Sequence, residues 1–181
     1  MTPFPFRFDA LGPAHDRTRF RCGEEALDRY LQTQASQDVR RRVANCFVAV
    51  EAATGHIAAY YTLSAASIPL VDLPPEETRR LPRYPTLPAV RIGRLAVDHR
   101  FQGRGLGAAL LMNAAHRIMQ ADAAAFTLLV DAKNDQAVAF YKHSGFRALS
   151  SQPPDAVSPT RGTFAASSLS PSFFGIFRPR N

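Results

Sequence analysis

The spacing of apolar residues along this 181-residue chain switches between the two-residue repeat of strands and the three- to four-residue repeat of helices. Runs rich in β-branched and aromatic residues predict strands at Phe4–Leu11, Asn45–Glu51, Ile57–Ser64, Ala89–Val97, Phe126–Asp131 and Phe146–Leu149. Helical spacing predicts helices over Glu24–Ala35, Ser36–Arg42, Leu106–Gln120 and Asn134–His143, with Gly145 ending the last one. The order predicts an α/β protein in which a helix joins two buried parallel strands.

The connections between these elements refine the prediction. The second and third strands are separated by a short Ala-Thr-Gly segment, which predicts a hairpin. Residues 69–88 hold six prolines, which predicts a loop with at most one helical turn. Gly93 lies inside the central strand and predicts a bulge or a close approach of the backbone.

The composition changes after residue 149. From Ser150 the chain is rich in Ser, Pro and Thr and poor in charge, and there only Phe173–Phe177 is predicted to form a strand. We therefore assign residues 1–149 to one domain and residues 150–181 to an atypical C-terminal segment.

Composition narrows the class of protein. Hydrophobic residues make up 46% and charged residues 20% of the chain, as in globular proteins. No apolar run is long enough to cross a bilayer and the start of the chain lacks a signal-peptide core, which predicts a cytoplasmic protein with no membrane partner. Cys22 and Cys46 have neither metal nor redox spacing, so we expect two free buried thiols and no metal site.

The positive charge comes almost entirely from arginine. The net charge is +7, and Lys133 and Lys142 are the only lysines. Such a charge favours a polyanionic partner, although an arginine-rich proteome encoded by a GC-rich genome gives the same composition. The arginines cluster in a run at residues 40–42 and ahead of and within the central strand, at Arg79, Arg80, Arg83, Arg91 and Arg94.

The most informative segment follows the central strand. Arg100 begins a turn that contains Gly103, Gly105 and Gly107 and leads into the helix predicted at Leu106. Backbone N–H groups at a helix start have no intrahelical partner, and the helix dipole adds positive potential there. Strand, glycine-rich turn and helix together therefore predict a cradle for a phosphate group. The dinucleotide-binding pattern is disfavoured, because Gly107 comes one position too early for it.

This segment resembles the acyl-CoA pyrophosphate loop of the GNAT N-acetyltransferase superfamily, through Arg100-x-x-Gly103-x-Gly105. The resemblance covers roughly residues 7–149. It implies an α/β GNAT fold, with a central mixed sheet whose two parallel strands splay apart to hold acetyl-CoA and with helices on its flanks.

Four further motifs are similar to the GNAT toxins of type II toxin–antitoxin systems. They are Phe20-x-Cys22-Gly23-x-x-x-Leu27-Asp28-x-Tyr30-Leu31, Leu81-Pro82-x-Tyr84-Pro85-x-Leu87-Pro88, Arg94-Leu95-Ala96-Val97-Asp98 and Phe140-Tyr141-x-x-x-Gly145-Phe146. This resemblance implies acetylation of the α-amino group of aminoacyl-tRNA, which blocks translation, and a ribbon-helix-helix antitoxin as partner. It leaves the oligomeric state open, a homodimer included. The C-terminal segment departs from the family, whose members end soon after the Gly-Phe pair.

The resemblance also implies roles for individual residues. Tyr141 matches the general acid that protonates the leaving thiolate, and its alternative role is that of a core aromatic residue. Val97 offers an N–H that polarises the thioester carbonyl. Asn134 lies where relatives contact CoA, although an Asn before a helix is as often a cap. The residues expected to bind acetyl-CoA are Leu95, Ala96, Val97, Arg100, Gln102, Gly103, Arg104, Gly105, Leu106, Gly107, Ala108, Asn134 and Tyr141.

The central strand carries arginine where many acetyltransferases of this fold carry a basic carboxylate. An α-amino group has a pKa of about 8, further lowered by an adjacent ester, and needs no strong base, whereas the lysine value is about 10.4. We therefore expect aminoacyl-tRNA as substrate, with phosphate contacts from Arg40, Arg41, Arg42, Arg91 and Arg94. His99, His116 and His143 are expected to be solvated rather than catalytic.

Two other functions remain open at this point. One is an ordinary GNAT enzyme that acetylates a small amine or a protein N-terminus, which an acidic substrate pocket would favour. The other is a degenerate acyl-CoA-binding protein that acts as co-repressor with its antitoxin, which the altered C-terminal segment would favour.

Overall fold

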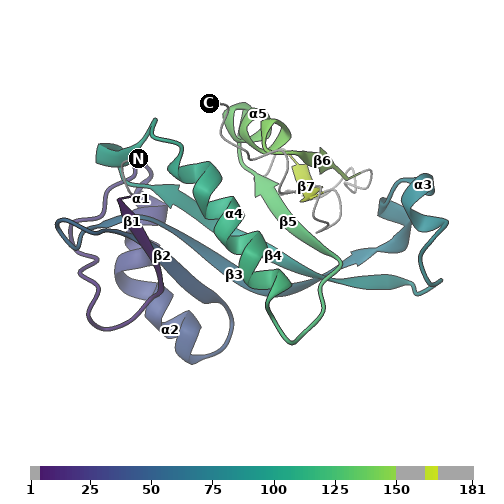
Figure 1. The fold of residues 1–181 in the computed structure, drawn as a ribbon, viewed down its shortest axis with the longest axis horizontal. Helices are drawn as coiled ribbons and strands as arrows, with labels where there is room; N and C mark the ends of the chain where they lie inside the picture. Colours follow the sequence, from purple (N-terminus) through teal and green to yellow (C-terminus); the bar gives the residue numbers. More distant parts are fainter. Residues whose placement is uncertain (1–4, 150–161, 167–181) are drawn as a thin grey trace. The chain divides into compact units, whose positions relative to one another are not determined.

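The computed structural model describes residues 5–149 and 162–166, and its chain divides into two compact units. Unit 1 comprises Met1–Ser64 and Gly93–Ala114, and unit 2 comprises Ala65–Ile92 and Ala115–Asn181. The elements are labelled in Figure 1. The strands hydrogen-bond in the order β1-β2-β3-β4-β5-β7-β6 in a mixed sheet, which confirms the expected α/β class.

Unit 1 begins with an antiparallel meander. Strands β1 (Phe6–Ala10) and β2 (Asn45–Glu51) pair along their full lengths. Strand β2 then pairs with the first part of β3 (Ile57–Pro69), with an irregularity between Ala49 and Val50. The predicted hairpin is therefore confirmed, although β3 continues past the predicted end at Ser64.

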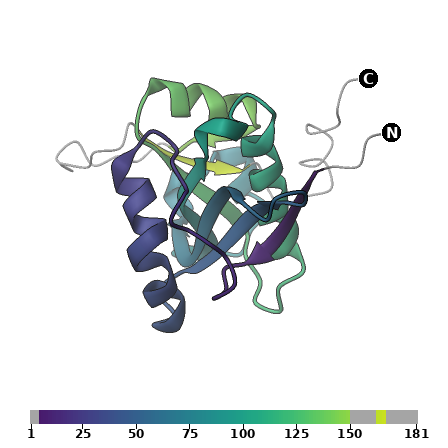
Figure 2. The ribbon, with the colours of Figure 1, turned by 90° about the vertical axis from the view of Figure 1, so that its left-hand side faces the viewer.

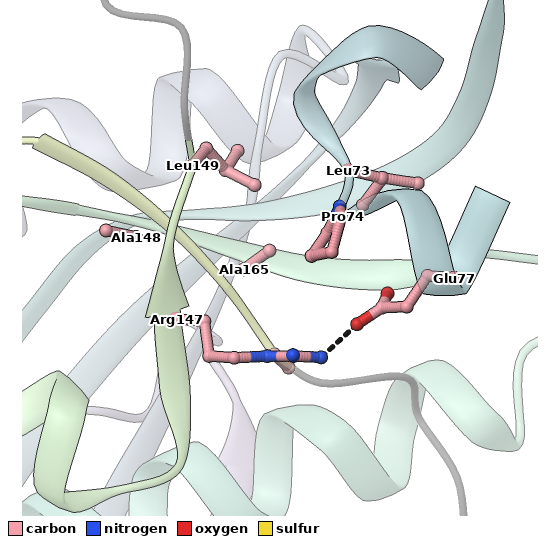
Figure 3. A pocket seen from close by; sticks show the side chains of 8 residues that line it. Leu73, Pro74, Glu77, Arg147, Ala148, Leu149 and Ala165 are labelled. Atoms are coloured by element: carbon pink, nitrogen blue, oxygen red, sulfur yellow. Dashed lines mark hydrogen bonds and ion pairs between the residues drawn. The ribbon is translucent and has the colours of Figure 1, made fainter.

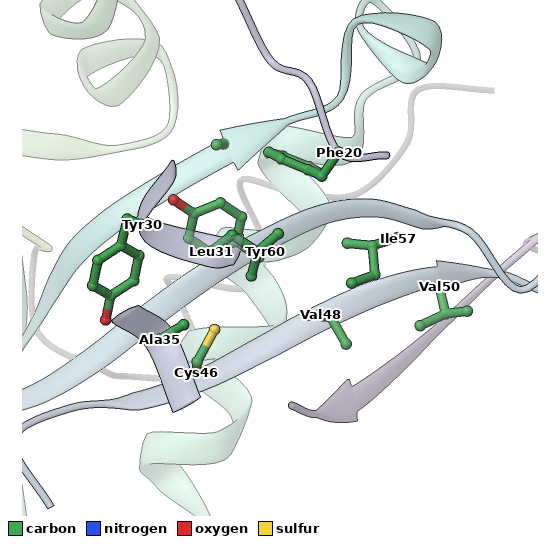
Figure 4. Packing of buried hydrophobic residues seen from close by; sticks show 10 residues of the cluster. Phe20, Tyr30, Leu31, Ala35, Cys46, Val48, Val50, Ile57 and Tyr60 are labelled. Atoms are coloured by element: carbon green, nitrogen blue, oxygen red, sulfur yellow. The ribbon is translucent and has the colours of Figure 1, made fainter. Parts of the chain in front are cut away.

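The two helices predicted near the N-terminus form one continuous helical run (Figure 2). It consists of α1 (Glu25–Arg29), a π-helical turn η1 (Tyr30–Gln34) and α2 (Ala35–Arg40). Its buried face packs Tyr30, Leu31 and Ala35 into a cluster with residues of β2 and β3 (Figure 4). This cluster also buries Cys46, whereas Cys22 is only half-buried, which corrects the expectation of two buried thiols.

The remaining elements of unit 1 build the candidate site. Strand β4 (Thr86–Val97) ends in unit 1 and is followed by a short 3₁₀ turn, η3 (His99–Phe101). Helix α4 (Leu106–Met119) begins there as predicted, with Leu106, Leu110 and Leu111 completely or almost completely buried.

Unit 2 contains the parallel strand pair. Residues Ala89–Ile92 of β4 pair in parallel with Thr127–Val130 of β5 (Thr127–Ala132). Helix α5 (Asp135–His143) follows β5, and Gly145, with φ of +85°, ends it as predicted. The proline-rich connection holds a 3₁₀ turn, η2 (Leu70–Asp72), and a one-turn helix, α3 (Pro75–Thr78).

One strand of unit 2 was not predicted. Strand β7 (Gly162–Ala166) pairs antiparallel with β5 and also with β6 (Phe146–Ala148). The expectation that only Phe173–Phe177 forms a strand after residue 149 is therefore wrong, and Phe173–Phe177 itself lies outside the described residues. The sequence of β7 has one large apolar residue, Phe164, so its pairing partners rather than its own pattern make it a strand.

No helix within residues 5–149 and 162–166 has both the length and the apolar character that a bilayer crossing requires.

Unit 2 has a small pocket between α3, β6 and β7, where the Arg147 guanidinium donates to the Glu77 carboxylate (Figure 3). Its volume of about 20 Å³ accommodates about one water molecule, so it is too small for a substrate.

Candidate active site

The glycine-rich turn has the backbone geometry that a phosphate cradle requires. Gly103 and Gly105 both have φ of +74°, a conformation that side-chain-bearing residues rarely adopt. No atom lies within 4 Å of where a Cβ of either glycine would stand, so the space beside both is open. The first backbone bond of α4 runs from Ala109 N to Gly105 O (3.1 Å). The N–H groups of the preceding helical residues are therefore available to an anion, and the helix dipole favours one.

The side chain of Arg100, a residue expected to bind the cofactor, is hydrogen-bonded within the protein. Its Nε donates to Asp98 Oδ1 (2.9 Å) and its Nη2 to Asp98 Oδ2 (3.0 Å). The Asp98 carboxylate is completely buried and also accepts from the backbone N–H groups of Arg100 and Arg21. Burial by itself would raise the pKa of Asp98, but these hydrogen bonds outweigh it and hold the pKa below its usual value.

Gln102 has a similar internal role. Its amide Nε2 donates to the carbonyl oxygens of Cys22 and Val97, both at 3.0 Å. His99 N donates to Arg21 O at 2.8 Å, so the turn is tied at several points to residues 21–22. We call this set of bonds from Asp98, His99 and Gln102 the latch.

The latch could not be predicted from the sequence. The motifs that contain Cys22 and Asp98 are both recognisable there, but they lie far apart in the chain and carry no sign that they meet. The side chains of Arg100 and Gln102 thus shape the turn, and the contact of these two residues with the cofactor remains a prediction. Arg104 is exposed, and within the described part of the chain its guanidinium has no carboxylate partner.

The end of β4 has the close contact that Gly93 predicted. A Cβ at Gly93 would lie 3.3 Å from Thr62 Oγ1, and the same hydroxyl accepts from Arg94 N at 3.0 Å. The parallel pairing of β4 with β5 ends at Ile92, while β4 itself continues to Val97. The predicted close approach is therefore confirmed, and Leu95, Ala96 and Val97 form the last residues of this strand.

In unit 2, Tyr141 on α5 is buried, with 8% of its surface exposed, and its ring packs beside Phe140 and Phe146. Within residues 5–149 and 162–166 its hydroxyl has no hydrogen-bond partner. Burial, with a smaller contribution from the Asp131 carboxylate, raises the pKa of Tyr141 to about 12. The phenol is therefore protonated at neutral pH and is suited to donate a proton rather than to accept one.

Asn134 is a helix cap. Its side-chain Oδ1 accepts from Ala137 N at 2.8 Å, so it satisfies one free N–H of the first turn of α5. The alternative that the sequence left open is thus confirmed for the side-chain oxygen. Contact of this residue with CoA remains a prediction.

The arginines expected to contact tRNA differ in their surroundings. Arg91 donates to the Asp131 carboxylate, which also accepts from Thr163. The Arg94 guanidinium lies 3.6 Å above the centre of the Tyr30 ring, whose hydroxyl donates to Asp38. Both are half-buried, whereas Arg40, Arg41 and Arg42 are exposed.

Arg42 also has an unusual backbone. Its φ of +57° makes it the only non-glycine residue with positive φ in the described part of the chain. Arg42 follows the end of α2, where Val43 N donates to Asp38 O at 2.9 Å. Glycine or asparagine usually occupies the position that Arg42 has here.

His99, His116 and His143 are all exposed, as expected of solvated residues.

Comparison with known proteins identifies the class. A GNAT acetyltransferase domain family matches residues 80–156. A tRNA-acetylating toxin of Mycobacterium tuberculosis is 37% identical over 138 residues, which cover 75% of this chain and 81% of that protein. The chain belongs to the GNAT family of acetyl-CoA-dependent N-acetyltransferases.

Two solved structures are also similar. AtaT complexed with acetyl-methionyl-tRNAfMet has a TM-score of 0.79 at 28% identity, over 88% of this chain and 93% of AtaT. A mutant AtaT toxin bound to the C-terminus of the antitoxin AtaR has a TM-score of 0.74 at 26% identity, over 96% of this chain and 99% of that one.

Proposed function

We propose that this protein is a toxin that acetylates the α-amino group of aminoacyl-tRNA in the cytoplasm and thereby blocks translation. The observation that carries the proposal is the charge of the central strand: Arg91 and Arg94 are the only ionisable side chains of β4. The nearby carboxylate of Asp131 is already bound by Arg91 and Thr163. A lysine amine, with a pKa of about 10.4, would need a base, whereas an α-amine with a pKa of about 8 does not.

The cradle would hold the donor. Acetyl-CoA supplies an acetyl group activated as a thioester. The N–H groups of Gly105 to Ala108 bind its pyrophosphate, and the guanidinium of Arg104 adds a positive charge beside them. The backbone of Leu95 to Val97 pairs with the pantetheine arm in the manner of an added strand. This arrangement uses backbone groups that the latch keeps in place.

The transfer itself needs two donors from the protein. The Val97 N–H polarises the thioester carbonyl as the neutral amine attacks it. The new C–N bond forms and the C–S bond breaks, while the amine releases a proton to water. Tyr141 donates its phenolic proton to the departing sulfur and regains one from solvent. The raised pKa of Tyr141 keeps the donor in its protonated form throughout the physiological range.

The proposed partner is a ribbon-helix-helix antitoxin. Support comes from the similarity to AtaT, which is solved with the C-terminus of the antitoxin AtaR. Co-expression with a ribbon-helix-helix protein encoded beside this chain is expected to yield a complex that restores translation in a cell-free system. Failure of every neighbouring gene product to bind would contradict this part of the proposal.

The function is tested with purified protein, labelled acetyl-CoA and a set of charged tRNAs. After nuclease digestion we expect N-acetyl-aminoacyl-adenosine from at least one tRNA, and none from deacylated tRNA. The Tyr141→Phe protein serves as the matched inactive control. If no charged tRNA is labelled although CoA binding is intact, the proposal is wrong, and a small-amine enzyme or a co-repressor becomes the better description.

A further inference from the structure

The proline-rich connection between β3 and β4 is a fixed structure rather than a loose loop. Leu70 N donates to Pro85 O at 3.0 Å, which closes the connection at its base. Inside it, backbone bonds from Arg79 N to Pro75 O (3.2 Å) and from Leu81 N to Thr78 O (3.2 Å) continue the α3 turn. The chain between the two strands is therefore held by its own backbone bonds.

Apolar residues anchor this connection in the core of unit 2. Leu73 and Leu87 are buried in a cluster with Ile68 and Leu129, and Leu81 packs against the same cluster. The Glu77 carboxylate accepts from Arg147 of β6, which ties α3 to the strand beside it. These anchors hold the backbone of the connection in place on the core of unit 2.

Outward, the connection presents three arginines and one aromatic ring. Arg79, Arg80 and Arg83 are exposed, and no acceptor within the described ranges binds their guanidinium groups. Tyr84 is 62% exposed, and its backbone N–H donates to Pro82 O at 2.9 Å. We call Arg79, Arg80, Arg83 and Tyr84 the Arg–Tyr surface.

Such exposure is uncommon in this protein. Only four large apolar or aromatic residues of the described chain are exposed, and two of them, Val71 and Tyr84, lie in this connection. They directly adjoin Leu70 and Pro85, the pair that closes it. Tyr84 and the prolines belong to a sequence motif that neither the cradle nor Tyr141 uses. An exposed aromatic ring on a rigid support, beside three unpaired guanidinium groups, has the composition of a surface for single-stranded nucleic acid.

We propose that the Arg–Tyr surface binds the tRNA substrate, with the Tyr84 ring stacked on an unpaired base and the arginines on neighbouring phosphates. The inference rests on the proposed function, because it takes tRNA as the polyanion. Guanidinium groups bind phosphates in bidentate fashion, and stacking on an aromatic ring tolerates any base. The surface would thus add affinity common to all tRNAs rather than choose among them.

The test measures binding of a purified, end-labelled deacylated tRNA to the full chain at several salt concentrations. Stacking on an aromatic side chain is worth about 1–3 kcal/mol per base, so Tyr84→Ala is expected to weaken binding about 5- to 150-fold, while Tyr84→Phe retains most of it. Replacing Arg79, Arg80 and Arg83 together with alanine should lower the salt slope by about 2. Arg7→Ala is the matched control, because Arg7 is an exposed arginine that already pairs with Asp9.

Acetylation assays separate the two proposals. If the function is right, the variants of the Arg–Tyr surface raise KM for charged tRNA and leave kcat and CoA affinity unchanged. Wild-type acetylation of charged tRNA with unchanged KM and salt slope in these variants would overturn the inference alone. Loss of a dimer with unchanged tRNA affinity would also overturn it, since the surface would then join two copies of the chain. Tyr84-dependent binding of tRNA without acetylation would support the surface and contradict the function.

Discussion

The cradle turn and helix α5 use their side chains in opposite ways. In the cradle the conspicuous side chains, Arg100 and Gln102, are bound internally to Asp98, Cys22 and Val97. The groups left for a ligand are backbone N–H groups and the open space beside Gly103 and Gly105. On α5 the Asn134 side chain caps the first turn, and the side-chain group without a hydrogen-bond partner in the described part of the chain is the Tyr141 hydroxyl.

This difference follows from what each region must recognise. A pyrophosphate is bound by several donors at once, which a turn at a helix start supplies if its backbone is held still. A departing thiolate needs one proton from one position, which a single phenol supplies if its ring is held by packing. In the cradle, polar side chains therefore hold the backbone groups that would bind the ligand. On α5, aromatic side chains hold the one side chain that would act on it.

Removing the Tyr141 hydroxyl should have the largest effect on activity. Tyr141→Phe keeps the ring between Phe140 and Phe146 but removes the proton donor, so kcat is expected to fall about 10²- to 10⁴-fold with CoA affinity unchanged. Rapid-quench measurement of N-acetyl-aminoacyl-tRNA gives kcat, and calorimetry gives the affinity. Near-normal transfer by this variant would reduce Tyr141 to a packing residue.

The pH profile of the wild-type enzyme sharpens the same point. Since the pKa of Tyr141 is raised to about 12, loss of its proton should not lower kcat/KM below about pH 10. Activity should instead rise toward alkaline pH as the substrate amine loses its proton. A decline between pH 8 and 9 that disappears in Tyr141→Phe would contradict the assigned pKa.

Placing a carboxylate in the cradle should mainly affect donor binding. In Gly105→Asp the new side chain would bind the free N–H groups of α4 and repel the pyrophosphate, so CoA affinity is expected to fall at least about 10-fold. Gly55→Asp is the matched control, because Gly55 has the same φ of +74° and the same open surroundings in the β2–β3 turn. Equal CoA affinity in the two variants would remove the cradle from the binding site.

Breaking the latch should act on the turn more than on the chemistry. Asp98→Asn removes the charge that holds Arg100, which should lower the free energy of unfolding by about 2 to 3 kcal/mol and weaken CoA binding several-fold. Because the pKa of Asp98 is depressed in the folded protein, its contribution is present above the unfolded value of about 3.9. The stability difference from wild type should therefore shrink as pH falls below about 4, which denaturant titrations measure. A difference that grows with acid would show that Asp98 is not the charged anchor.

Arg42→Gly should have the smallest and most selective effect. Glycine suits the φ of +57° at this position, so the variant is expected to gain about 1 kcal/mol in stability. It also loses one proposed phosphate contact, so KM for charged tRNA should rise a few-fold at low salt and depend less steeply on salt concentration than in the wild type. Arg42→Asn, which tolerates the same backbone, should behave alike. Unchanged KM in both would remove Arg42 from the substrate surface.

The sequence by itself determined the local parts of this protein. Gly103 and Gly105, the helix start at Leu106, the cap at Asn134 and the helix end at Gly145 all depend on residues a few positions apart. The parallel pairing of β4 with β5 could also be predicted, because a helix between two buried strands leaves few other arrangements. The backbone conformation of a turn and the free N–H groups of a helix start are local properties, so the glycine-rich motif with Gly103 and Gly105 is enough to predict both.

The tertiary structure decided which side chains remain available to a ligand. The sequence predicts Arg100, Gln102 and Arg91 as binding residues, and in the folded chain their side chains hydrogen-bond to Asp98, Cys22 and Asp131. Strand β7 was equally hidden, since its neighbours β5 and β6 define it rather than its own residues. A hydrogen-bond partner that lies tens of residues away leaves no periodic trace in the sequence. Only the fold could therefore show that Arg91 binds Asp131, and that the Tyr141 hydroxyl has no partner within residues 5–149 and 162–166.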